Sequence, residues 1–439
     1  MKRVLIITYY WPPSGGIGVL RCLKFAKYFR QFGWEPIIYT ASNPQYPYID
    51  HSNDKDVPEG VEILKHPIFE PFSLFKKITR RKKDEPISNP LVTKGENRSV
   101  IEKLAIWIRA NFFIPDARAL WIKPSVKFLS QYLRENKVDA ILSNGPPHTN
   151  SIIACRLAQQ FSVPWLADFQ DPWTQVDYYS LFPIGKRADR IHKRMEQEVF
   201  KTASKITIVS PAWKRDLEEI GAKDVDVVYW GYDEDDFKNL SIHKEEKFQI
   251  VHAGILGEDR YAENFFIAIS ELCNEFPEFE RDLHIRFFGM VDHSIQKSIQ
   301  ENNIAHMAQL EGTKPRNEIL SIVASADLLL LPLNKSKNIN GRIPGKLFEY
   351  LRTQVPILCI GPQTSDVALI LSHTGAGKTF EYEDKVGIKT FIKSNYENYN
   401  LGLKTKTNIG AIEQFNVINQ TKSIAKLLNN ISTRSNVKS

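Results

Sequence analysis

A glutamate one turn into a short predicted helix is the side chain best placed for chemistry in this sequence. The segment Asn340–Pro362 reads NGRIPGKLFEYLRTQVPILCIGP and predicts a helix over Lys346–Arg352, with Glu349 in its first turn. The free amides of a helix N-terminus favour anions, and a carboxylate accepts hydrogen bonds from hydroxyl groups. This combination suits a phosphorylated sugar or a nucleotide. An ordinary strand–helix–strand unit with a solvated glutamate would explain the same spacing.

Polar side chains also follow two predicted strands in the first half of the chain. Val138–Ser143 is an apolar run, and His148 lies in the turn after it. The next apolar run ends in Asp168 and Asp171, three positions apart. Ligands of open α/β sheets collect at the carboxyl edge of the strands. The two carboxylates could hold a metal, act as a general base or bind hydroxyls, whereas a lone histidine is more often only a turn residue.

The elements that must position these side chains are alternating strands and helices. Val4–Tyr10 is a buried strand at the start, and Gly15 and Gly16 lie in the loop that leads into a helix. These glycines do not form the G-x-G-x-x-G pattern, and the strand Glu35–Ala41 does not end in an acid. A dinucleotide fingerprint is therefore unsupported, and a tight strand–helix turn explains the glycines equally well.

The second half restarts the strand–helix rhythm and indicates a second domain. Phe248–Ala253 is a strand, and further buried strands follow at Leu283–Phe288 and Ala326–Leu333. We expect one α/β domain over residues 1–240 and another over 241–408, with an acidic linker at the boundary. The tail predicts a long amphipathic helix from residue 409 to about 430.

Composition narrows the class of protein. The chain has 439 residues, 42% of them hydrophobic and 25% charged, which is typical of a globular protein with two domains. A net charge of +7 is modest for this length and does not favour nucleic acid. The four cysteines lie singly in apolar segments, as expected of small core residues in a reducing compartment. We see no signal peptide, and no apolar run approaches the roughly 20 residues that span a bilayer.

Several stretches together resemble the retaining glycosyltransferases of family four, in a branch that assembles bacterial polysaccharides. The segments P-G-K-L-F-E-Y-L, G-P-P-H and A-D-F-x-D-P-W are similar to motifs of that branch, and Trp230 begins a segment that resembles the family's N-G-Y-D. Glu349 matches the second glutamate of the family's donor motif. Gly341 stands where the first would be, so the resemblance leaves the donor sugar open.

This resemblance implies a GT-B fold, in which two Rossmann-like α/β domains face a cleft and the C-terminal helix, about 409–432, packs back on the first domain. It implies a metal-independent enzyme without a cofactor, which moves a hexosyl or N-acetylhexosaminyl group from a nucleoside-diphosphate sugar to an acceptor hydroxyl. The residues implied as catalytic are His148, Arg260 and Lys346. Those implied as donor-binding are Gly15, Gly16, Gly254, Arg260, Arg342, Gly345, Lys346 and Glu349, and those on the acceptor side are Asp168 and Asp171.

Two other functions fit the same fold. One is a sugar-nucleotide epimerase, which would convert the donor alone into an isomer. The other is a non-catalytic nucleotide-sugar-binding partner, which the missing first glutamate would explain.

A basic run and an aromatic helix favour contact with a membrane surface. Lys76–Lys83 reads KKITRRKK, and Val100–Phe113 has apolar residues at helical spacing, including Trp107. Such a pair suits an anionic leaflet, although a solvated loop and a helix packed on the sheet would explain it too. We therefore expect a cytoplasmic protein with peripheral contact at the inner face of the membrane, acting on a lipid-linked glycan.

Overall fold

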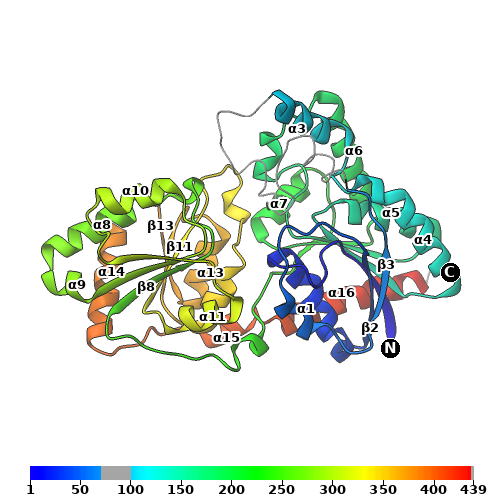
Figure 1. Ribbon diagram of the computed structural model, residues 1–439. Helices are drawn as coiled ribbons and strands as arrows, with labels where there is room; N and C mark the ends of the chain where they lie inside the picture. The colour runs from blue at the N-terminus through cyan, green and yellow to red at the C-terminus, as the bar shows by residue number, and fades with distance from the viewer. Residues whose placement is uncertain (71–99, 437–439) are drawn as a thin grey trace. The chain divides into compact units, whose positions relative to one another are not determined.

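The computed structural model describes residues 1–70 and 100–436, and the chain divides into two compact units (Figure 1). The first unit combines Met1–Tyr229 with the C-terminal segment that begins at Val417, and the second comprises Trp230–Asn416. The division falls somewhat before the predicted position near residue 240. The segment after Trp230 is tied to the second unit, because the backbone amide of Tyr232 donates to the carbonyl of Phe415 (3.1 Å).

The first unit is built on a seven-stranded parallel sheet in the order β3-β2-β1-β4-β5-β6-β7. The strand order reverses between β1 and β4, and this switch point is where ligands of doubly wound sheets bind. The strands are β1 Lys2–Ile7, β2 Trp34–Ala41, β3 Glu62–His66, β4 Ala140–Gly145, β5 Trp165–Phe169, β6 Lys205–Ile208 and β7 Val225–Val227.

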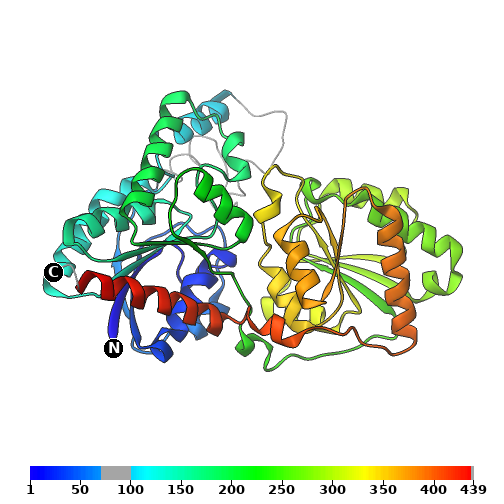
Figure 2. The same ribbon diagram turned by 180° about the vertical axis from the view of Figure 1, so that it is seen from behind.

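Helices cover both faces of this sheet, and one comes from the far end of the chain. They are α1 Ile17–Phe29, α3 Val100–Phe112, α4 Ile122–Glu135, α5 Thr149–Phe161, α6 Lys186–Thr202, α7 Pro211–Glu219 and α16 Val417–Asn436. Helix α16, red in Figure 2, packs on α1 and beside β4 and β5. Its Ile424 and Leu428 are fully buried in one core cluster with Val4 and Phe25.

The second unit repeats the plan with six parallel strands in the order β10-β9-β8-β11-β12-β13. The strands are β8 Phe248–Ala253, β9 Leu283–Phe288, β10 Ala308–Gly312, β11 Leu328–Pro332, β12 Ile357–Ile360 and β13 Gly377–Phe380. The helices are α8 Glu263–Glu275, α9 Pro277–Asp282, α10 His293–Glu301, α11 Arg316–Ser325, α12 Lys346–Thr353, α13 Asp366–Thr374, α14 Lys385–Asn400 and α15 Ile409–Glu413. The predicted α/β class with two doubly wound sheets is confirmed.

The single helix predicted from residue 409 to 430 is wrong in one respect, because the structure forms two helices there. The Asn408 side chain accepts a hydrogen bond from the amide of Ala411 (3.1 Å) and caps α15. Helix α15 ends at Glu413, and the buried Phe415 anchors the turn before α16 begins at Val417.

Helix α3 packs against α6 rather than on the sheet (Figure 1). Only Ile106 is buried, and the opposite face carries a row of exposed apolar residues: Val100, Ile101, Leu104, Trp107, Ile108 and Phe112. The basic run Lys76–Lys83 lies outside the described residues. In the ranges 1–70 and 100–436, no helix is both long and apolar enough to span a bilayer.

Candidate functional site

The carboxyl end of β8 meets the start of α12 in the second unit. The backbone amide of Ala253 donates to the hydroxyl of the buried Tyr350 (2.9 Å), which fixes α12 against the strand. Gly254 follows with φ of 116°, a conformation that favours glycine. A Cβ atom at Gly254 would collide with the Nζ atom of Lys346. The tight approach places the first residue of α12 directly over the edge of the sheet.

Two cations come together at this edge. Arg260 is held by the side chain of Asn334 (Nε to Oδ1, 3.1 Å) and by the carbonyl of Ile255 (Nη1 to O, 3.0 Å). Burial, and then the charge of Arg260, lower the pKa of Lys346 to about 7, although Glu349 opposes the shift. Two neighbouring positive charges destabilise each other's charged forms, and an anion bound beside them would stabilise both. The edge is therefore suited to a phosphate or diphosphate.

The depressed pKa of Lys346 predicts a pH-dependent affinity for nucleoside diphosphates. In the free protein the lysine loses its proton above pH 7, while a bound diphosphate requires the charged form. Affinity should therefore fall as the pH rises, by roughly tenfold between about pH 7 and 8.5. The phosphate itself does not titrate in this window, since its second pKa is about 6.

The matched control is Lys346→Arg, because a guanidinium stays charged across the whole range. Calorimetric titrations with UDP and with GDP should give a pH-independent affinity for this variant. A wild-type affinity that does not change with pH would contradict a titrating lysine at this site.

Glu349 lies in a chain of ion pairs that the sequence did not predict. Its Oε1 atom accepts from Nη2 of Arg316 (2.6 Å), and Nη1 of Arg316 donates to Oδ2 of Asp236 (2.8 Å). These two carboxylates raise the pKa of Arg316 above its usual value although burial opposes the shift. The side chain of Glu349 is 21% exposed, so a ligand can still reach it. Arg316 therefore fixes the orientation of the Glu349 carboxylate, whose contact with a ribose stays a prediction.

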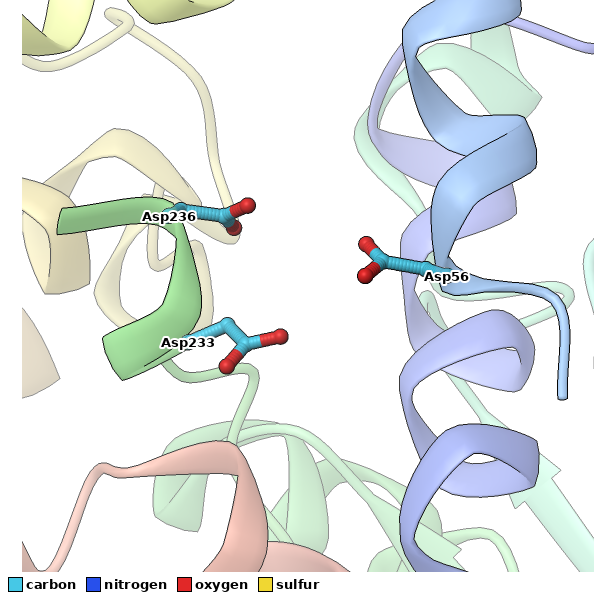
Figure 3. Close-up of side chains that lie close together, drawn as sticks. All are labelled: Asp56, Asp233 and Asp236. Atoms are coloured by element: carbon cyan, nitrogen blue, oxygen red, sulfur yellow. The ribbon is translucent and has the colours of Figure 1, made fainter. Parts of the chain in front are cut away.

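Figure 3 shows Asp236 and Asp233 at the short 3-10 helix η5, Glu234–Phe237. Asp233 caps this turn, since its side chain accepts from the amide of Asp235 (3.1 Å). Asp56, also labelled there, belongs to the first unit, in which it pairs with Lys24 (2.6 Å) and Lys27 (2.8 Å).

The remaining predicted donor residues of the second unit lie around the same helix start. Gly345 is the N-cap residue of α12, and Arg342 follows the 3-10 turn Ile339–Gly341. A residue that the sequence analysis missed, His252, lies at the end of β8. Its Nδ1 atom donates to the carbonyl of Leu330 (3.0 Å), and burial lowers its pKa, so the imidazole is neutral.

The glycine loop of the first unit follows β1, as predicted. Gly16 has φ of 79° and precedes α1, while a Cβ atom at Gly15 would collide with the ring of Tyr48. The amide of Gly15 also donates to the carbonyl of Tyr48 (2.9 Å). Both glycines are thus required by the turn and its own packing. Contact with a ligand at Gly15 and Gly16 stays a prediction.

His148 lies at the carboxyl end of β4 and starts α5. Its ring stacks on Trp173 at 4.5 Å between centroids and an interplanar angle of 2°. Trp173 Nε1–H in turn donates to Nδ1 of His192 (3.1 Å). Burial, and then repulsion from His192, lower the pKa of His148 to about 3, so its imidazole is neutral at physiological pH. Its Nδ1 atom has no hydrogen-bond partner among the described residues.

His148 also lines a pocket formed entirely by the first unit. The pocket has a volume of about 190 Å³. It lies among the end of α3, the segment 113–118, the turn before α5, and the loop between β5 and α6. Its wall combines aromatic rings with charged groups: Tyr10, Arg109, Phe113, Asp116, Arg118, His148, Trp173, Tyr178, Tyr179, Phe182 and His192.

The expected acceptor role of Asp168 requires a correction. This carboxylate is 1% exposed and accepts from Nε (2.6 Å) and Nη2 (2.7 Å) of Arg21, from Thr207 Oγ1 (2.7 Å) and from Asn144 Nδ2 (2.9 Å). A buried carboxylate whose oxygens are already bound in this way is structural. Asp171 is only half-buried on the following loop, and its acceptor role stays a prediction.

The structure thus brings the predicted residues together in two groups. Gly254, Arg260, Lys346 and Glu349 meet within the second unit, while His148 adjoins the pocket of the first. The sequence analysis missed Arg316, Asp236, His192 and Arg109. Trp173, which stacks on His148, could have been found from the sequence, because it is the last residue of the A-D-F-x-D-P-W motif.

Comparison with known proteins assigns this architecture to a class. A glycosyltransferase from Rickettsia africae is 14% identical, with 98% of each chain covered and a TM-score of 0.62. HepE from Anabaena, solved in complex with UDP-glucose, is 12% identical, covers 100% of this chain and 99% of its own, and has a TM-score of 0.56. WaaG, a glycosyltransferase involved in lipopolysaccharide biosynthesis, is 11% identical, with 98% of each chain covered and a TM-score of 0.54. The fold is GT-B.

Within that class, residues 112–232 match the family described as Glycosyl transferase 4-like domain. The resemblance to family-four glycosyltransferases is therefore confirmed, and the domain includes His148 and the segment from Asp168 to Trp173. No curated protein sequence matches the chain significantly.

Proposed function

We propose that this protein is a retaining glycosyltransferase that uses a nucleoside-diphosphate sugar as donor. The observation that carries the proposal is the pair of cations, Arg260 and Lys346, at the start of α12, with Glu349 one turn further along. The pair suits a diphosphate, and we assign Glu349, whose side chain is 21% exposed, to the ribose hydroxyls. The UDP-glucose bound by HepE, which shares the fold, supports a donor of this chemical class.

In the proposed reaction the bond between the anomeric carbon and the diphosphate oxygen breaks. The acceptor oxygen forms a bond to the same face of that carbon, and its proton passes to the departing phosphate. Arg260 and Lys346 stabilise the negative charge that develops on the diphosphate. His148 keeps its predicted role, a contact with the donor sugar or with the reacting phosphate. No protein nucleophile is required.

A panel of sugar nucleotides tests this function. The protein should be stabilised against heat by its donor, and prolonged incubation should release free nucleoside diphosphate without producing a new sugar isomer. The product of transfer should keep the anomeric configuration of the donor, as measured by NMR. Metal independence is a separate prediction, and the rate should be unchanged in EDTA. An isomerised donor would instead identify an epimerase.

Replacing Glu349 with glutamine should weaken nucleoside-diphosphate binding, because a neutral amide is a poorer acceptor for two hydroxyls than a carboxylate. Hydrogen bonds to a charged group contribute about 1.5–3 kcal/mol, so the loss should be at least tenfold. Arg316 also donates to Asp236 (2.8 Å), so it should keep a carboxylate partner in this variant, and the fold should remain. Glu318→Gln, an exposed position on α11, serves as the control. Equal calorimetric affinities for the two variants would show that Glu349 does not bind ribose.

We further propose that the acceptor is a lipid-linked glycan in surface polysaccharide assembly, reached by peripheral contact with an anionic membrane. The exposed apolar row on α3 supports this, because an apolar helix face can enter the interfacial region of a bilayer. The involvement of WaaG in lipopolysaccharide biosynthesis supports a related role for this chain.

Binding to anionic vesicles should weaken as salt rises but should not vanish. Attraction between the Lys76–Lys83 run and lipid is screened over about 8–10 Å, whereas insertion of Trp107 and Phe112 is not. Flotation assays should show that charge reversal at Lys76, Lys77, Arg80 and Arg81 removes most of the binding.

The control for the apolar row replaces the exposed Leu401 and Leu403 of the second unit with serine, which should leave binding unchanged. Replacing Trp107 and Phe112 with serine should remove the binding that persists at high salt. Failure of the wild-type protein to bind anionic vesicles at low salt would rule out the membrane contact.

A further inference from the structure

The ring of His148 is held in place without a hydrogen bond at its buried nitrogen. Within the described residues its Nδ1 atom has no hydrogen-bond partner, and it lies against Gly145, where a Cβ atom would come within 3.1 Å of it. A histidine that takes part in a reaction is usually oriented by a hydrogen bond at one ring nitrogen, which leaves the other for the substrate. Here stacking on Trp173, with an angle of 2° between the ring planes, takes the place of that bond.

The position of Trp173 depends in turn on His192 of α6. The indole is 3% exposed, and a buried indole N–H requires an acceptor. His192 supplies its Nδ1 atom, 3.1 Å from Nε1 of Trp173, and the two rings are nearly perpendicular, at 89°. Burial lowers the pKa of His192, although Asp116 and Asp189 oppose the shift. The imidazole therefore stays neutral, and its Nδ1 atom keeps the lone pair that accepts this bond.

Helix α6 holds the rest of the same loop along one face. Glu196, one turn after His192, accepts from the amide (3.2 Å) and the hydroxyl (2.6 Å) of Thr174. Asp189, one turn before His192, accepts from the hydroxyl of Tyr179 (3.1 Å). Positions three and four apart share one face of a helix. The loop after β5 is therefore fixed to α6 along this face, and the bond to His192 sets the plane of the indole.

We infer that His192 is a positioning residue of the transfer reaction, which acts through Trp173 to fix the plane of the His148 ring. In this role His192 holds the indole and not a substrate atom. Without this acceptor, the buried indole N–H must turn toward another partner, and the stacked imidazole must turn with it. The inference rests on the proposed function, in which His148 contacts the donor sugar or the reacting phosphate.

The first test measures the orientation of the His148 ring and needs no substrate. A ring that is stacked on an indole is shielded by it, so the ring protons of His148 should resonate upfield in NMR spectra of the full chain with isotope-labelled histidine. The spectrum of His148→Ala identifies these signals. His192→Phe should remove the upfield shift, whereas His192→Asn, whose side-chain oxygen can accept from the indole, should keep most of it. An unchanged shift in His192→Phe overturns the inference.

A matched pair of tryptophans separates the loss of this bond from a general loss of stability. Trp173→Phe keeps an aromatic face but removes the N–H, so it should change the His148 signals as His192→Phe does. Trp165 is also buried and donates through Nε1 to Ser143 (2.9 Å), in adjacent strands of the same sheet. Trp165→Phe should lower the melting temperature to a similar extent and leave the His148 signals in place. Loss of these signals in Trp165→Phe as well would assign the effect to the fold and overturn the inference.

The second test is a double-mutant cycle in donor turnover, measured as nucleoside diphosphate released from the sugar nucleotide that the panel identifies. His192→Phe should lower kcat by about 10–100-fold with little change in KM, because a misplacement of about 1 Å can have an effect of this size. His192→Asn should recover most of the rate. In the His148→Ala background, His192→Phe should have no further effect, since the two residues act as one unit. Equal fold-losses in both backgrounds would show a merely structural role and overturn the inference.

Failure of this inference can be distinguished from failure of the proposed function. Calorimetric binding of UDP and GDP should be the same in the His192 variants and in wild type, because the diphosphate is assigned to Arg260 and Lys346 of the second unit. Arg194→Gln, an exposed position on α6, should match wild type in every measurement. Turnover with an unchanged kcat in His192→Phe overturns the inference alone. If no sugar nucleotide is turned over, the proposed function fails, and the NMR signals still show whether His192 holds the ring.

Discussion

Replacement of Asp168 by asparagine should destabilise the first unit by about 3–5 kcal/mol, because it removes the carboxylate that neutralises a buried arginine. Arg21 and Asp168 are both 1% exposed in their side chains and share two hydrogen bonds, of 2.6 and 2.7 Å. The same guanidinium donates to the carbonyls of Val228 (3.0 Å) and Tyr229 (2.9 Å). Denaturant unfolding, followed by a probe specific to the first unit, measures the effect.

Asp171→Asn is the matched control, since it removes a nearby carboxylate at a half-exposed position in the loop after β5. Its effect should be smaller than that of Asp168→Asn, because the carboxylate of Asp171 is only partly removed from water. Combining Arg21→Met with Asp168→Leu should recover much of the stability lost in Asp168→Asn, because buried ion pairs are often replaceable by apolar residues. Equal unfolding free energies for Asp168→Asn and Asp171→Asn would contradict the structural role of Asp168.

Arg260→Ala should lower kcat/KM by about 10²–10³-fold with little change in stability. Removal of one electrostatic donor at a developing anion typically raises the barrier by about 2.7–4 kcal/mol. In the folded protein Arg260 donates to the side chain of Asn334 and to the carbonyl of Ile255. Steady-state kinetics with the identified donor, together with thermal unfolding of the same samples, measure both quantities.

Arg342→Ala is the comparison for this variant. Arg342 follows the turn Ile339–Gly341 and is half-buried near the same helix start, so its removal should have a smaller effect on transfer. If Arg260→Ala keeps the wild-type kcat/KM while Arg342→Ala loses most of it, the diphosphate is stabilised by Arg342 instead.

The strands and helix α12 could be predicted because their signals are local. The apolar runs at Val4–Tyr10 and Phe248–Ala253 became β1 and β8, and the P-G-K-L-F-E-Y-L stretch became α12 with Lys346 at its start. Both kinds of signal lie within a few residues of the element that they specify. The turn after β4 that contains His148 could be predicted for the same reason, because its signal is local.

The role of Asp168 could not be predicted in this way, because its partner lies 147 positions earlier in the chain. A carboxylate at a strand end looks the same in sequence whether it meets a substrate or an arginine of a neighbouring helix. Arg316 is 33 positions from Glu349 and begins a helix without any distinguishing pattern. The pocket escaped prediction for the same reason, since α3, α5 and α6 supply its residues from separate segments.

The position of α16 has a consequence for the order in which the protein folds during synthesis. Its Ile424 and Leu428 complete the core that contains Val4 and Phe25, so the first unit is interrupted in sequence by the whole second unit. Domains of most chains fold as they emerge, the N-terminal one first. Here the segment that completes the core around β1 is synthesised only after the whole second unit. Until then, the apolar face of β1 and α1 stays open to chaperones, and the second unit can complete its fold first.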